Sequence, residues 1–245
     1  LRQQAARISD KNYQLRVRVR ENLLRKAQIA DLRPVVDEII DQQLSSDDYR
    51  GLEQAILLSV ALHEAERCPT YLKLLEFPRL ETSLIAAWAL QELAQTPELM
   101  AGILAHTLPL TERLVKRERT EFPEHLRLAF LFETMGRNRY QPALDSLKLF
   151  IPKEHSMGDI CRASAIWAVG KIIEGSQDAG VAQALAERMM DFDPTNPEDR
   201  LVQFNSIVGL GWIKAPDSLE KIKGLRKTGG VQDLAAEWAK LQLTK

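Results

Sequence analysis

The chain contains few of the residues that most often carry chemistry. Of its 245 residues, two are cysteines and four are histidines, and they are scattered along the sequence. The two cysteines, Cys68 and Cys161, offer no disulfide framework, and we expect both to be small buried residues. The segment HEAER at residues 63–67 has Arg67 where the zinc-protease motif requires a second histidine. The sequence therefore predicts no metal site.

Catalytic and nucleotide-binding motifs are also missing. The sequence has no C-x-x-C pair, no G-x-G-x-x-G turn, no G-K-[ST] phosphate loop and no G-x-S-x-G nucleophile elbow. Each of these motifs places a nucleophile, a metal or a phosphate-binding backbone on a short stretch of chain. Their absence argues against the enzyme classes that depend on them, and we expect a protein without enzymatic activity and without a bound cofactor.

Charge of one sign and long hydrophobic runs are lacking as well. The chain has 33 basic and 34 acidic side chains, which give a net charge of -1, so no overall field attracts it to nucleic acid or to a membrane surface. No apolar run is long enough to span a bilayer, and we expect a soluble protein, by default in the cytoplasm. The sequence starts at Leu1 and not at a methionine, and we expect that a leader or a preceding domain has been removed.

A repeated apolar segment dominates what the sequence does contain. Residues 83–93 read SLIAAWALQEL, residues 162–172 read RASAIWAVGKI, and residues 204–213 read FNSIVGLGWI. Apolar residues recur in these segments at helical spacing. The displacements between the segments correspond to a period of roughly 40 residues, which is typical of helical-pair repeats. We expect weaker copies at residues 49–65 and 126–136.

The clearest copy, residues 161–190, reads as an apolar helix, a polar turn and a second apolar helix. Its A-x-W-A-[LV]-G pattern at residues 165–170 resembles the HEAT repeat, especially the short HEAT-like repeats of phycobilin lyases. The resemblance implies an all-α fold, a right-handed α–α superhelix of the HEAT/armadillo solenoid type, in a single domain over residues 1–245 with about five to six helical pairs. Residues 231–243 are expected to form a C-terminal capping helix, and the charged residues 111–121 an insertion in their repeat.

Repeat architectures of this kind mostly present surfaces to other molecules. We therefore predict a non-enzymatic protein–protein interaction scaffold or adaptor module, whose partner is another protein. Binding surfaces depend on a few aromatic or arginine anchors. The candidate partner-binding residues are Trp212, Arg137, Arg139, Tyr140, Arg113 and Arg117.

The tryptophans differ in their expected roles. Trp88 and Trp167 occupy the same repeat position and are expected to fill space between successive helices. Trp212 instead aligns with the polar residues Lys171 and Glu92, which indicates an outward-facing site. It is therefore either an interaction anchor or covered by the C-terminal helix. That helix carries an apolar stripe of Val231, Leu234, Trp238 and Leu241.

Two other functions remain open. Clustered basic residues would fit a nucleic-acid-binding or DNA-repair module of HEAT-like type, but the interleaved acidic residues favour local ion pairs. The clusters are Arg16, Arg18, Arg20, Arg25 and Lys26; Arg113, Lys116, Arg117 and Arg119; Arg137 and Arg139; and Lys221, Lys223, Arg226 and Lys227. The resemblance to phycobilin lyases implies the second alternative, a chromophore lyase-like enzyme.

An acid-rich loop, DFDPTNPED at residues 191–199, offers oxygen atoms of the kind that bind calcium. It lacks the glycine of a tight calcium loop, and Pro194 and Pro197 restrict its backbone. We therefore favour a helix N-cap, in which acidic side chains lie at the positive end of the next helix.

Overall fold

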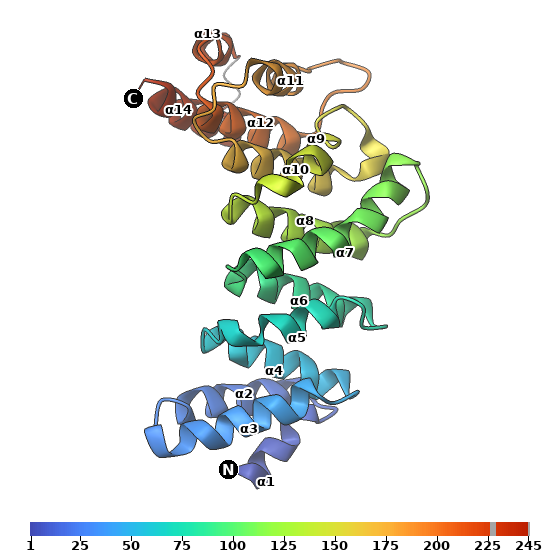
Figure 1. The fold of residues 1–245 in the computed structure, drawn as a ribbon, viewed down its shortest axis with the longest axis vertical. Helices are drawn as coiled ribbons and strands as arrows, with labels where there is room; N and C mark the ends of the chain where they lie inside the picture. The colour runs from blue at the N-terminus through green and yellow to red at the C-terminus, as the bar shows by residue number, and fades with distance from the viewer. Residues whose placement is uncertain (226–228, 245) are drawn as a thin grey trace. The chain divides into compact units, whose positions relative to one another are not determined.

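The computed structural model describes residues 1–225 and 229–244, and within these ranges all regular elements are helices (Figure 1). The predicted all-α class is confirmed. Arg226 and Lys227 of the last basic cluster lie outside the described residues. Among the helices that the structure describes, none is long and apolar enough to cross a membrane.

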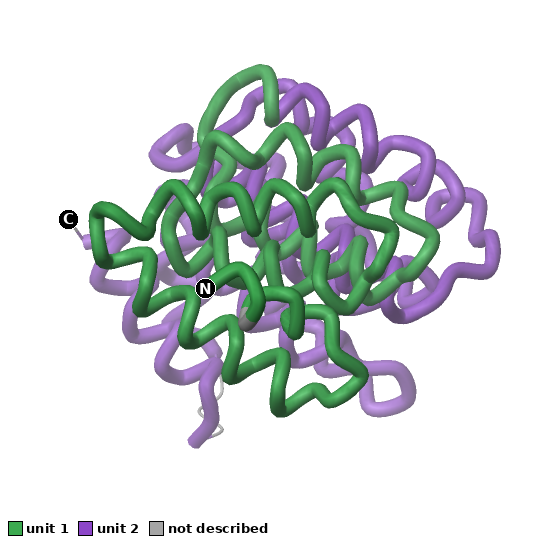
Figure 2. The backbone as a smooth tube through the Cα atoms, turned by 90° about the horizontal axis from the view of Figure 1, so that it is seen from below, with its two compact units in different colours: residues 1–99 green, residues 100–245 purple. Residues whose placement is uncertain are grey.

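Two compact units divide the chain, residues 1–99 and residues 100–245 (Figure 2). Helix α7 (Pro97–Val115) contains the boundary between them. The expected single domain over residues 1–245 stays a prediction. Short 3₁₀ turns are found at Ala6–Ser9, Ala30–Leu32, Ala65–Arg67, Gln141–Ala143 and His155–Met157.

The first unit is organised around one apolar helix. Its helices are α1 (Arg2–Ala5), α2 (Tyr13–Lys26), α3 (Arg33–Leu44), α4 (Tyr49–Ala61), α5 (Cys68–Leu74) and α6 (Leu80–Leu93). Helices α2, α3 and α6 all pack against α4, and α5 packs against α6. Apolar side chains cover several faces of α4, and Leu52, Ile56 and Leu58 are completely buried, so this helix forms the centre of the unit's core.

The second unit contains helices that pack one on the next in chain order. Its helices after α7 are α8 (Phe122–Arg137), α9 (Leu144–Lys148), α10 (Asp159–Ile172), α11 (Ala179–Met189), α12 (Arg200–Ile213), α13 (Ser218–Lys223) and α14 (Val231–Leu243). Helix α8 packs on α10, α10 on α12, and α12 on α14 (Figure 1). Helices α9, α11 and α13 pack against α10, α12 and α14 in turn.

Small residues set the spacing of this series. At each step a glycine of one helix faces a glycine or alanine of the next. The three pairs are Gly136 with Ala168, Gly170 with Gly209, and Gly211 with Ala239. A Cβ atom placed on Gly170 would lie 2.9 Å from the Cα atom of Gly209 and 3.0 Å from the Trp212 ring. The helices therefore approach each other at backbone contact distance, which only glycine permits here.

Candidate functional site

A ladder of three tryptophans links the last helices of the second unit. Trp167 on α10, Trp212 on α12 and Trp238 on α14 meet edge to face, with ring centroids 5.4 and 5.7 Å apart and interplanar angles of 89° and 80°. This geometry places the positive edge of one ring on the negative face of the next, and each such contact is worth about 0.5–1.5 kcal/mol beyond burial. All three side chains are half-buried, so each ring also presents a surface to solvent.

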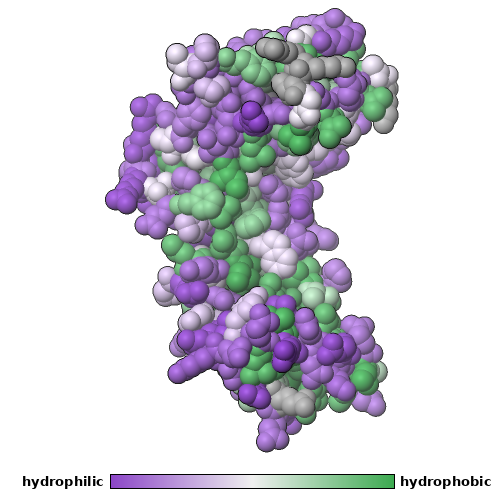
Figure 3. Space-filling model, turned by 180° about the vertical axis from the view of Figure 1, so that it is seen from behind, coloured by the Kyte–Doolittle hydropathy of each residue, from purple (hydrophilic) through white to green (hydrophobic). Residues whose placement is uncertain are grey.

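These rings border an open groove of about 670 Å³. The groove is lined by Trp167, Phe204, Asn205, Val208, Trp212, Val231, Leu234, Ala235 and Trp238. No charged side chain belongs to this lining, and Asn205 is its one amide among the residues described. On the face seen in Figure 3, hydrophobic residues of the second unit lie in patches among hydrophilic ones. Exposed apolar surface of this kind is the usual mark of an interaction site.

The helical spacing of α12 explains why these residues line the groove together. Asn205, Val208 and Trp212 are spaced by three and four positions, so they lie on one face of the helix. Gly209 and Gly211 of the same helix allow close packing against neighbouring helices. The helix therefore uses small residues for its neighbours and large ones for the surface.

Helix α14 packs differently from the expectation. The apolar stripe was expected to cover the last repeat, but Val231, Leu234 and Leu241 are 60%, 71% and 61% exposed. The buried side chains of α14 are alanines, among them Ala239, which meets Gly211. Alanine allows the two backbones to approach, and this close approach turns the larger side chains outward. Trp238 of the stripe contacts Trp212 of α12.

The alignment left two roles open for Trp212, an exposed interaction anchor or a residue covered by the C-terminal helix, and Trp212 has features of both. It is covered on one edge by Trp238 of the C-terminal helix, and it also lines the groove. Lys171, the residue that occupies the Trp212 position in the preceding copy, places its ammonium 4.9 Å from the centre of the Trp212 ring. The Lys171 Nζ atom also bonds the Glu174 carboxylate at 2.9 Å, and Arg139 Nη2 bonds the same Oε2 atom at 2.6 Å. The hydrogen bond from Lys171 lowers the pKa of Glu174.

The other candidate residues do not gather at the groove. Arg137 is the exposed last residue of α8, and Tyr140 lies half-buried three residues later. Arg113 instead bonds Glu124 in the first turn of α8, at 2.9 Å. The first and last turns of α8 are about 20 Å apart at 1.5 Å per residue. The six candidates thus occupy at least two separate places.

Arg117 illustrates what the charged segment at residues 111–121 does locally. Its backbone takes a left-handed conformation (φ 58°) just after α7, and its guanidinium bonds Glu154 at 2.5 Å. Arg113 likewise has Glu118 and Glu124 as ion-pair partners. Arg113 and Arg117 are thus neutralised by acidic neighbours, as the interleaved sequence indicates.

Both cysteines are free and buried, as expected. Burial raises the pKa of the Cys68 thiol to about 11 and also raises the pKa of Cys161. A thiol in such surroundings stays protonated at neutral pH, and the thiolate is the reactive form. Neither side chain therefore has the properties of a nucleophile.

The sequence interpretation missed a buried ion pair between Arg162 and Glu198. Arg162 on α10 is 0% exposed, and its two terminal nitrogens bond the two Glu198 oxygens at 2.7 and 2.8 Å. Burial is the largest influence and by itself would raise the pKa of Glu198, but the hydrogen bonds and charge of Arg162, the backbone N–H of Asp199 and the charge of Arg188 together lower the pKa. The pair ties the loop before α12 to α10. The available signal was an arginine within a stretch of small buried residues, because a buried arginine requires an acid.

The acid-rich loop itself is a helix cap, as predicted. Asp199 is the N-cap of α12 and accepts a hydrogen bond from Leu201 N at 2.8 Å. Asp193 accepts backbone hydrogen bonds from Thr195 and Asn196 within the loop. These carboxylates thus satisfy backbone donors of their own segment.

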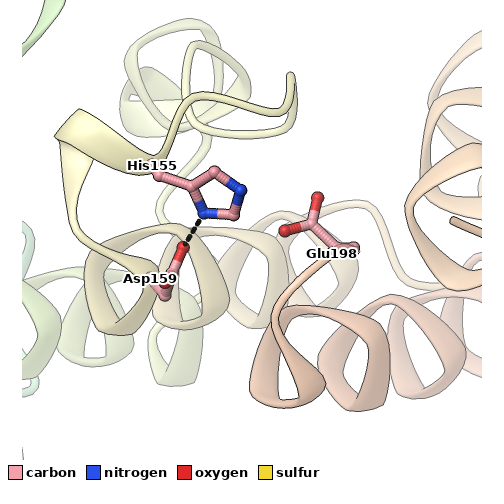
Figure 4. A group of neighbouring side chains, drawn as sticks. All are labelled: His155, Asp159 and Glu198. Atoms are coloured by element: carbon pink, nitrogen blue, oxygen red, sulfur yellow. Dashed lines mark hydrogen bonds and ion pairs between the residues drawn. The ribbon is translucent and has the colours of Figure 1, made fainter. Parts of the chain in front are cut away.

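One group of side chains has ligand atoms close enough together for a metal ion. His155, Asp159 and Glu198 have ligand atoms within 4.8 Å of one another, and His155 Nδ1 bonds Asp159 Oδ1 at 3.0 Å (Figure 4). The Arg162 guanidinium already engages both Glu198 oxygens. A fixed positive charge at that distance repels a divalent cation, so we interpret the group as part of the ion-pair network.

A scan against protein-family models finds no match to this chain, and a search of curated proteins finds no relative.

Proposed function

We propose that this chain is a protein-interaction module, a scaffold or adaptor built as an α-solenoid of HEAT-like repeats. The serial packing of α8, α10, α12 and α14 supports the solenoid interpretation, because each step repeats the same glycine-to-small-residue contact. In such a stack each helix buries its apolar face on the next, and the remaining faces form a surface for partners.

The single observation that carries the proposal is the apolar groove at the tryptophan ladder. A folded protein seldom leaves residues such as Leu234, 71% exposed, beside three half-buried tryptophans unless that surface has a partner. Tryptophans in a pocket are typical binding anchors. We propose that a partner protein covers this groove.

The alternatives have less support. Binding to nucleic acid needs positive charge that is not neutralised. Arg113, Arg117 and Arg139 each pair with a glutamate, although Arg18, Arg25 and Lys26 of α2 form no ion pair with a described residue. A chromophore lyase would need a carboxylate near its tryptophans, and the described lining of the groove includes none. Neither alternative explains the exposed apolar side chains of α14.

Affinity capture from the source cells with mass spectrometry tests the proposal. The full chain is compared with Leu234→Glu, which places a charge in the groove, and with Leu149→Glu, which alters an exposed leucine outside it. We expect the Leu234 variant to lose a partner protein that the Leu149 variant retains. Identical protein sets for all three chains would contradict the proposal, as would retention of nucleic acid that weakens steeply with salt.

A further inference from the structure

One polar side chain in the groove lacks a hydrogen-bond partner. Asn205 is 8% exposed and lines the groove among the three tryptophans. Its amide bonds no other residue within the two ranges that the structure describes. The amide nevertheless reaches solvent, because it is not among the fully buried side-chain atoms without a partner. An unpaired amide that opens into a groove points to a ligand.

The preceding step of the helix series shows why Asn205 is unpaired. Where α8 meets α10, Ser164 donates a hydrogen bond to Glu133 at 2.9 Å. Ser164 and Asn205 each lie four residues before the small residue of their contact. On the partner helices, Glu133 lies three residues before Gly136, and Trp167 lies three residues before Gly170. Asn205 therefore corresponds to Ser164, but Trp167 occupies the position that corresponds to the acceptor Glu133.

The chemistry of an amide narrows the choice of partner. The Asn205 side chain has a donor and an acceptor in one plane, which match the N–H and C=O of a peptide group. The groove lining has no charge, so the part of the ligand that enters it is uncharged. Peptide groups within a helix are already paired to each other, whereas those of an extended segment are available.

We infer that the groove binds an extended, uncharged peptide segment of a partner protein. A main-chain peptide group of that segment pairs with the Asn205 amide, and an apolar side chain of the segment packs among Trp167, Trp212 and Trp238. This inference rests on the proposed function and adds the chemical class of the partner. Main-chain pairing supplies affinity, and the tryptophan groove selects the side chain.

A library of linear peptides displayed on phage and selected on the full chain tests the inference. Selected peptides are made with blocked ends, and their Kd is measured with the unmodified chain, with Asn205→Leu, and with Gln42→Leu, which also exchanges an amide for leucine but at an exposed position of α3. We expect a loss of about tenfold for the Asn205 variant alone, the effect of about 1.4 kcal/mol of hydrogen bonding. The melting temperature of Asn205→Leu should equal or exceed that of the unmodified chain.

N-methylation of the peptide, one position at a time, identifies the main-chain contact. At one position it should weaken binding to the unmodified chain about tenfold and leave binding to Asn205→Leu unchanged, because that variant has no amide to lose. The inference is wrong if selection yields no peptide, if the selected peptides bind as helices by circular dichroism, or if Asn205→Leu melts lower. Capture of a partner that depends on Leu234 but not on Asn205 would also overturn it, while leaving the proposed function intact.

Discussion

Two neighbouring helix contacts of the second unit, α8 with α10 and α10 with α12, share the close approach of a glycine to a small residue. They differ in whether the polar side chain beside that approach has a hydrogen-bond partner. Between α8 and α10, Ser164 finds an acceptor in Glu133. Between α10 and α12, the corresponding Asn205 lies with Trp167 in the groove lining and bonds no residue that the structure describes. The comparison teaches that the spacing of the helices is set by small residues, while the side chains beside them decide whether a contact is closed or open to a ligand.

The ion pair between Arg162 and Glu198 is a third polar contact of this unit. It is completely buried, so we expect its loss to have the largest effect on stability. Replacing Glu198 with alanine removes the bidentate partner of the buried Arg162 guanidinium, which keeps the Asp159 contact at 3.4 Å and the Pro152 carbonyl. We expect a loss of about 3–5 kcal/mol in the free energy of unfolding. Urea denaturation measures this. Glu220→Ala, which breaks the exposed pair with Lys223, should cost less than about 0.5 kcal/mol. Equal effects would show that burial does not govern these pairs.

The Glu198 pair should also respond to pH. Its pKa in the folded chain is lowered from the ordinary 4.5, so its contribution to stability is complete above pH 4.5 and is lost as the pH falls through the lowered pKa. Stability below pH 4.5 should therefore decline less steeply in Glu198→Ala than in the unmodified chain. Parallel curves of unfolding free energy against pH would contradict this assignment.

The close spacing of the helices is tested by adding a methyl group where two of them meet. Gly170→Ala places a methyl group against Gly209 and the Trp212 ring, and we expect a loss of about 2 kcal/mol from overpacking. Gly180→Ala is the control, since its nearest atom outside the helix backbone, Asp178 Oδ1, would lie 3.4 Å away. That variant should be as stable as the unmodified chain. A neutral Gly170 variant would show that the helices separate easily.

The closed contact is tested by Ser164→Ala. Loss of the hydrogen bond to Glu133 should lower the free energy of unfolding by about 1 kcal/mol. Chemical denaturation of the single variant is sufficient, because alanine keeps the helix and the close packing. An unchanged midpoint would mean that this bond does not distinguish the two contacts.

The open contact should respond in the opposite direction. Asn205→Leu removes an unpaired amide and keeps a side chain of similar volume, so we expect a gain of up to about 1 kcal/mol. The same denaturation series measures it beside Ser164→Ala. Destabilisation would show that the Asn205 amide supports the fold instead of a ligand.

Much of the helical content was predictable from local pattern. The repeats at residues 162–172 and 204–213 lie within α10 (Asp159–Ile172) and α12 (Arg200–Ile213), and the Asp199 cap was also foreseen. The outward stripe of α14 was not, because Val231 and Leu234 look like a buried face when the alanines beside them are ignored. Arg162 was overlooked because its partner, Glu198, is distant in sequence.

The sequence alone determined the all-helical class and the positions of helices such as α10 and α12, because periodicity and capping act over a few neighbouring residues. Only the tertiary structure decided that three tryptophans form one ladder, that Glu198 reaches Arg162 and that Asn205 has no partner among the described residues. These depend on which side chains meet across helices that are close in space and far apart in the chain, and helical period does not encode such a meeting.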